Sequence, residues 1–239
     1  MRLRAEEFRP CAGRYAFRVV QPRPALRHTT LVDPTRDWGY LVGDHDGLAR
    51  LAGLFSFAAY SPHTVVHVPL RQSIPRDFPQ GVPVDLVLVH QTLGLRPSTW
   101  PALRRRLTHG VPLTVRTDER RTARHGAAWE ELWERRWDRL LRTDRIQPAV
   151  HARTLFLSGA RDTFAAASVR VGRAAGFGPL HTRAAKGHDV LCASLTALLP
   201  LSRGRGTELD IGFQAYPPLA HFTPPGRSAR RRRPTAASP

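Results

Sequence analysis

The chain has 239 residues and carries 37 lysine and arginine residues against 19 aspartate and glutamate residues, a formal net charge of +18. Its hydrophobic fraction of 41% is typical of a globular protein and excludes a chain that is unfolded throughout. Its length excludes a mini-protein that needs disulfides or metal to fold, because a chain of this size buries roughly 70% of its unfolded surface. The charge indicates nucleic acid, anionic lipid headgroups or an acidic partner.

The basic residues are almost all arginine. Lys186 is the one lysine, so arginine makes up 36 of the 37 basic residues, and asparagine does not occur. Lysine and asparagine have AT-rich codons, which predicts a bacterium with a GC-rich genome as the source. Codon bias explains the choice of arginine over lysine but not the excess of positive charge, since aspartate and glutamate tolerate GC-rich codons. The arginine content alone is therefore weak support for phosphate recognition.

The two cysteines, Cys11 and Cys192, form neither a disulfide framework nor a zinc-ligand spacing. We expect both to be reduced thiols in a reducing compartment. The most apolar window, residues 48–60, is shorter than the roughly 20 residues that a membrane span needs. The sequence therefore predicts a cytoplasmic protein with no membrane span, no bound metal and no cofactor.

The first part of the chain predicts two strands and a helix. Residues 14–20 alternate and are rich in β-forming residues, and a second short strand is expected at 28–32. Asp44 or Asp46 can cap a helix whose apolar positions recur at three- and four-residue steps. A serine–proline pair at 61–62 ends this helix.

The middle of the chain holds the clearest strand, residues 84–90. Its nearly continuous apolar run predicts burial on both faces, as in a parallel sheet. Further strands are expected at 64–70 and 112–117, and helices at 98–107 and 127–142. The last of these helices carries a tryptophan stripe that we expect in the core.

The remaining elements complete an α/β pattern. Strands are expected at 153–158 and 180–185, and helices at 162–175 and 189–199. The alternation of strands and helices predicts one layered α/β domain, residues 1–200, with a largely parallel sheet flanked by helices. Residues 201–239 are rich in proline, glycine, serine and arginine, so we expect a disordered basic tail there.

Six polar residues follow the predicted strands at the ends where ligands bind in open α/β sheets. They are His90, Ser158, Arg161, Asp162, Lys186 and His188. If the strands are parallel, all six lie on one rim. The turn that begins at Ser158 leads into a helix, so its amides and Arg161 can hold an anion such as phosphate or carboxylate. The alternatives are a structural turn capped by Asp162 and a solvated loop around Lys186.

Several segments resemble parts of an α/β-hydrolase. Residues 86–90 followed by 98–100 are similar to a strand, oxyanion loop and first helix of that family, and residues 154–162 are similar to its acid-bearing strand end. The resemblance implies that Asp162 orients His188, which would act as the general base. The chain has no G-x-S-x-G motif, and Gln91 stands where the family has glycine. The resemblance therefore supplies no nucleophile.

The expected tail contains the densest charge, four consecutive arginines: Arg230, Arg231, Arg232 and Arg233. Such a run contacts phosphates without reading sequence. The leading hypothesis is therefore non-specific binding of nucleic acid or another polyanion through the arginine-rich surface and tail. Two alternatives remain open: a small-molecule enzyme with a site on the rim, and a structural or interaction protein without catalysis.

Overall fold

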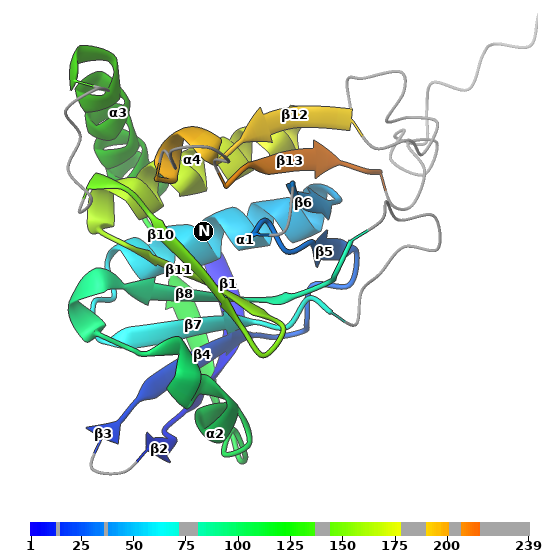
Figure 1. Ribbon diagram of the computed structural model, residues 1–239, viewed down its shortest axis with the longest axis vertical. Coiled ribbons are helices and arrows are strands. Elements are labelled where there is room, and N and C mark those ends of the chain that lie inside the picture. The colour runs from blue at the N-terminus through cyan, green and yellow to red at the C-terminus, as the bar shows by residue number, and fades with distance from the viewer. Residues whose placement is uncertain are drawn as a thin grey trace, which may run out of the picture.

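The computed structural model describes residues 1–12, 15–35, 38–71, 81–136, 144–177, 190–200 and 207–215. Its larger sheet has seven strands in the order β10-β11-β8-β7-β4-β1-β9 (Figure 1). These strands are β1 (Arg2–Phe8), β4 (Arg18–Pro22), β7 (Thr64–Val68), β8 (Asp85–His90), β9 (Val111–Arg116), β10 (Gln147–His151) and β11 (Thr154–Gly159).

A second sheet of four strands has the order β12-β13-β6-β5. Its strands are β5 (Thr29–Leu31), β6 (Gly39–Gly43), β12 (Val190–Ser194) and β13 (Leu209–Phe213). A two-stranded ribbon joins β2 (Cys11–Ala12) to β3 (Tyr15–Ala16). The α-helices are α1 (His45–Ala59), α2 (Trp100–Arg104), α3 (Glu119–Arg136) and α4 (Arg161–Phe177), and the short 3-10 turns are η1 (Gln91–Leu93), η2 (Pro97–Thr99) and η5 (Thr196–Leu198).

Two helices fill the space between the sheets (Figure 1). Helix α1 packs on β7 and β8 of the main sheet and reaches β6, and α4 packs on α1, β12 and β13. The expected cap is present, since the Asp44 side chain accepts a hydrogen bond of 2.8 Å from the Gly47 amide. Because α1 is covered on several sides, most of its residues are buried, and they form one continuous core with both sheets.

The opposite face of the main sheet is covered only in part. The segment from η1 to α2 lies on it, and Trp100 and Leu103 pack there against a smaller core. That core also contains Phe8, Val19, Val65, Val87, Val89 and Phe156. Toward β1 and β9 the same face carries exposed polar side chains.

The layered α/β class predicted from the sequence is confirmed, with helices flanking a seven-stranded sheet. The direction of the strands differs from the expectation of a largely parallel sheet. Only β11–β8 and β4–β7 are parallel, and the other four strand pairs of this sheet are antiparallel. The continuous apolar run of β8 reflects burial on both faces, which an antiparallel neighbour such as β7 supplies equally well.

Two expectations for the C-terminal part were wrong. The segment expected as a helix at 189–199 forms strand β12 and a 3-10 turn, and residues 209–213, expected in the disordered tail, form strand β13. Strand β13 pairs with β12 and with β6, and it buries Leu209, Ile211 and Phe213. The folded part therefore continues past the boundary expected at residue 200. The strand expected at 180–185 lies outside the described residues.

The hairpin from β10 to β11 has an unusual turn. Ala152 and Arg153 link the strands with φ angles of 48° and 57°. This is the left-handed region, which costs a non-glycine residue roughly 1–2 kcal/mol. Turns of this kind favour Asn-Gly, so the sequence contains no signal for the hairpin.

No helix in the described ranges has the length and apolarity required to cross a lipid bilayer.

Candidate functional site

The structure brings the four described residues of the predicted rim to one edge of the main sheet. Strands β8 and β11 run parallel, and Gly159 lies opposite His90 in the register. Ser158 is the penultimate residue of β11, beside this pair, and Arg161 and Asp162 begin α4 at the same edge. Lys186 and His188 lie outside the described residues, so their place on the rim stays a prediction.

The described contacts at this rim join residues near in sequence and one residue of α3. Asp162 Oδ1 accepts a hydrogen bond of 2.8 Å from Arg161 Nε and lies 3.1 Å from His125 Nδ1 of α3. His90 Nδ1 lies 2.8 Å from the Thr92 hydroxyl. Burial and the nearby His63 lower the pKa of His90. The described partners of Asp162 are thus an arginine and a histidine that sequence reasoning did not assign to it, and an enzyme site at this rim stays a prediction.

A surface of exposed arginines lies on the open face of the main sheet. We call it the arginine face and define it by Arg2 and Arg4 of β1, Arg23 after β4 and Arg116 of β9. Arg2 stands directly opposite Arg116, and the Arg23 amide donates to the Arg4 carbonyl, so these residues are cross-strand neighbours. Within the described residues the only carboxylate paired with this face is Glu6, 2.8 Å from Arg23.

Like charges directly opposite each other on neighbouring strands destabilise a sheet. Arg2 and Arg116 form such a pair, and Arg4 follows Arg2 on the same face at a distance of roughly 7 Å along the strand. In the described part of the chain, no carboxylate pairs with Arg2, Arg4 or Arg116. A bound polyanion would supply the missing negative charge.

A buried ionic cluster lies on the same sheet face beneath α2. Its centre is Asp85, whose side chain is only 4% exposed. Asp85 Oδ1 accepts hydrogen bonds from the amides of Leu70 and Arg71, at 3.1 and 3.2 Å. Asp85 Oδ2 accepts one of 2.8 Å from Arg71 Nε and lies 3.6 Å from an Arg104 nitrogen. Three hydrogen bonds from residues 70–71 and the ion pair with Arg104 therefore fix the carboxylate in position.

His67 completes this cluster. Gln21 Nε2 lies 2.7 Å from His67 Nδ1. An amide nitrogen can only donate, so Nδ1 accepts and the ring proton is on Nε2. That nitrogen lies 3.9 Å from Asp85 Oδ2 and has no hydrogen-bond partner in the part of the chain that the structure describes. The Trp100 ring covers the imidazole edge-on at 4.9 Å between ring centres.

The cluster shifts the pKa values of both His67 and Asp85. Burial lowers the pKa of His67, and this outweighs the opposing effect of Asp85, with Arg104 and Arg71 lowering it further. Burial alone would raise the pKa of Asp85, but His67, the Arg71 amide and the Arg71 charge outweigh it and hold this pKa below 3.8. At neutral pH the cluster therefore contains a neutral histidine and an ionised aspartate.

A cavity of about 480 Å³ opens beside the cluster. Its described lining contains three arginines, Arg71, Arg104 and Arg153, together with His67 and Asp85. It lies where β7 ends and where β8 and β11 begin, at the edge opposite the predicted rim. Sequence reasoning did not identify this site. The sequence did carry one signal for it, since Asp85 is a carboxylate inside the most apolar strand.

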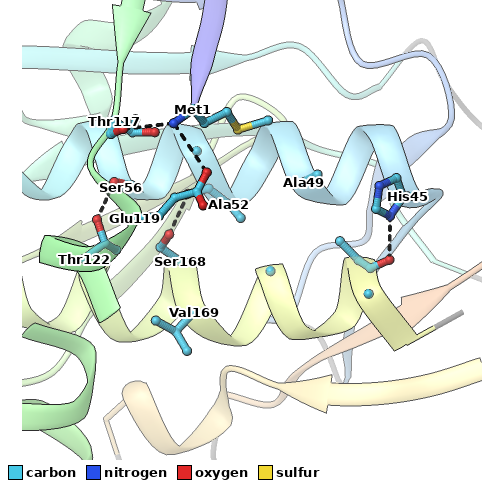
Figure 2. A pocket seen from close by; sticks show the side chains of 14 residues that line it. Met1, His45, Ala49, Ala52, Ser56, Thr117, Glu119, Thr122, Ser168 and Val169 are labelled. Carbon is cyan, nitrogen blue, oxygen red and sulfur yellow. Dashed lines mark hydrogen bonds and ion pairs between the residues drawn. The ribbon is translucent and has the colours of Figure 1, made fainter. Parts of the chain in front are cut away.

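A second hollow, of about 360 Å³, lies between α1 and α4 (Figure 2). It is lined mostly by small residues, and its polar groups bind one another. Ser168 donates to the Ala52 carbonyl at 2.8 Å, the Ser56 and Thr122 hydroxyls lie 2.7 Å apart, and the terminal amine of Met1 donates to the Thr117 carbonyl. This hollow follows from close packing of two helices through small side chains and presents no free charged group among its described residues.

Neither a family model, nor a curated protein, nor a solved structure matches the chain. The resemblance to α/β-hydrolases therefore rests on the short segments that suggested it. No group of three or more potential metal-ligating side chains occurs among the described residues.

The buried His67 predicts a fall in stability on mild acidification. In the unfolded chain this histidine takes up a proton near pH 6.5, whereas its folded-state pKa is lower. The neutral, buried form of His67 is therefore fully tolerated by the folded protein above pH 6.5. As the pH falls below 6.5 and through the folded-state pKa of His67, the unfolded chain takes up a proton that the folded protein does not, and stability is lost. We expect the urea midpoint to drop between pH 7.5 and about pH 5.5, and His67→Gln to flatten this dependence. The same slope in His67→Gln and wild type would refute the assignment, and His151→Gln, at an exposed position, is the control.

Proposed function

We propose that the protein binds nucleic acid without sequence specificity, through phosphate contacts on the arginine face. The observation that carries the proposal is the direct pairing of Arg2 with Arg116, beside Arg4 and Arg23, with Glu6 as the only paired carboxylate among the described residues. Phosphate contacts from arginine fix a protein on nucleic acid but carry no sequence information. The formal charge of +18 adds long-range attraction to the same partner.

The proposal places the protein in the cytoplasm. Nucleic acid is abundant there, and Cys11 and Cys192, which are both free thiols, stay reduced.

The first test is a fluorescence-anisotropy titration of the full chain with short duplex DNA and single-stranded RNA. We expect the triple variant Arg2→Gln/Arg4→Gln/Arg116→Gln to bind at least about tenfold more weakly near 0.1 M salt, because it loses three phosphate contacts. The matched control is Arg120→Gln/Arg124→Gln/Arg136→Gln, which removes the same charge from exposed positions on α3. We expect this control to bind nearly as well as wild type.

This control distinguishes binding by the arginine face from binding that depends only on the net charge of the chain. Equal losses in the two triple variants would mean that total charge alone governs binding, and the arginine face would then have no special role. Absence of binding in the wild type at moderate salt would end the nucleic-acid hypothesis altogether.

The predicted tail is a second contributor. Arg230, Arg231, Arg232 and Arg233 lie outside the described residues, so their role stays a proposal. It is tested by replacing all four with serine in the full chain. Deleting residues 202–239 is not a suitable test, because that deletion also removes β13 from the second sheet. An unchanged affinity after the serine substitutions would show that the tail does not contribute.

A further inference from the structure

We infer that the cavity beside Asp85 is a binding site for a phosphate-type oxyanion, either free phosphate or the phosphate group of a small monoester. This inference concerns a different site from the arginine face and does not depend on nucleic-acid binding. The cavity volume of about 480 Å³ lies in the range of roughly 300–1,000 Å³ that is usual for small-ligand sites.

The charge of the cavity points to an anion of more than one charge. Three guanidinium groups and one carboxylate line it among the described residues, which leaves a net charge of +2 because His67 is neutral. A phosphate monoester carries about −1.5 to −2 at neutral pH and therefore matches this excess. A single carboxylate would leave part of it uncompensated.

The donors of the cavity are not used up by the protein itself. Asp85 engages Arg71, but Arg104 has no hydrogen bond among the described residues and only the ion pair at 3.6 Å. Arg153 is exposed, and its side chain has no partner in the described part of the chain. His67 Nε2–H is a further donor without a hydrogen bond. Guanidinium groups with free donors are the usual ligands of phosphate oxygens.

The backbone holds these donors in place before a ligand binds. Arg153 occupies the strained turn after β10, where its φ is 57°, and the Asp85 amide donates to its carbonyl at 3.0 Å. Arg104 is carried by α2, which Trp100 anchors in the core. Strain of this kind persists only where the surrounding structure enforces it, and it concentrates at ligand sites.

The test is isothermal titration calorimetry of the full chain with inorganic phosphate, adenosine monophosphate and adenosine. We expect the two phosphate ligands to bind and adenosine not to bind. Arg104→Gln and Arg153→Gln should each weaken phosphate binding at least about tenfold, since each removes a charge-assisted hydrogen bond. Arg105→Gln, at the exposed residue that directly follows α2 and does not line the cavity, is the matched control and should bind as wild type.

The relative affinities of the two phosphate ligands distinguish free phosphate from a monoester as the natural source. The inference is overturned if neither ligand binds at millimolar concentration, if Arg105→Gln loses as much as Arg104→Gln, or if Arg153→Gln binds as wild type. Arg153→Gln keeps the test decisive even if Arg104→Gln is unstable, because Arg153 is exposed. The arginine-face triple variant should retain phosphate affinity, so failure of one site is distinguishable from failure of the other.

Discussion

Replacing Asp85 with asparagine is expected to lower the free energy of unfolding by about 3 kcal/mol at neutral pH. The substitution removes the one carboxylate among the described residues that compensates Arg71 and Arg104, and it places amide hydrogens against guanidinium donors. Breaking a buried ion pair costs about 3–5 kcal/mol, and the partial exposure of the two arginines, 30% and 31%, places the effect at the lower end. Urea unfolding followed by circular dichroism measures the difference.

The control for this prediction is Asp46→Asn. Asp46 is 75% exposed and lies 3.6 Å from Arg50, so its loss should cost less than about 1 kcal/mol. The low pKa of Asp85 adds a pH signature. Its stabilisation is present above the ordinary aspartate pKa of 3.8 and is lost as the pH falls through the folded-state pKa, so wild type and Asp85→Asn should converge in acid. Equal stability of Asp85→Asn and Asp46→Asn at pH 7 would refute the role of the cluster.

Replacing Trp100 with alanine is expected to cost about 3–5 kcal/mol. Its side chain is fully buried, meets His67 and Phe156 edge-to-face, and fastens α2 to the open face of the main sheet. The substitution leaves a cavity between α2 and the sheet and also releases Arg104 from its position beside Asp85. Both the urea midpoint and the affinity for phosphate should fall.

Trp100→Phe is the matched control, because the indole Nε1 is buried and has no hydrogen-bond partner among the described residues. Phenylalanine keeps most of the apolar contact and removes that unsatisfied donor, so this variant should lose less than about 1.5 kcal/mol. If Trp100→Ala is no less stable than Trp100→Phe, α2 is not anchored as described.

The elements that follow from local pattern were predictable from the sequence. Helix α1 has a capping aspartate and regular apolar spacing, and strand β8 has an uninterrupted apolar run, so both were expected within a residue of their ends. A parallel direction of β8 and β11 was also expected, but their direct pairing, which places His90 and Ser158 at one edge, came only from the structure.

Elements that depend on distant partners were not predictable in the same way. Strand β12 has the composition of a short helix and becomes a strand because β13 pairs with it. Strand β13 carries Leu209, Ile211 and Phe213 in alternation, but a surrounding segment rich in proline and glycine concealed this signal. Strand β1 alternates arginine with small apolar residues, and its role became clear only from its place between β4 and β9.

The candidate sites also divide into one that local sequence pattern predicts and others that depend on distant residues. The rim followed from the rule that ligands bind at the carboxyl ends of parallel strands. The cavity beside Asp85 lies at the other edge of the sheet, and its described lining comes from four separate segments, which no spacing in the sequence connects. The arginine face depends on register, because only the pairing of β1 with β9 places Arg2 opposite Arg116.

The most direct test of the proposed function is the salt dependence of duplex DNA binding by the full chain. The slope of log K against log salt should fall in magnitude by about 2.7 in Arg2→Gln/Arg4→Gln/Arg116→Gln relative to wild type, since each lost phosphate contact removes about 0.9. The α3 triple variant should change the slope by less than about 1. An unchanged slope in the arginine-face variant, or an equal fall in the α3 control, would contradict the assignment of this face to nucleic acid.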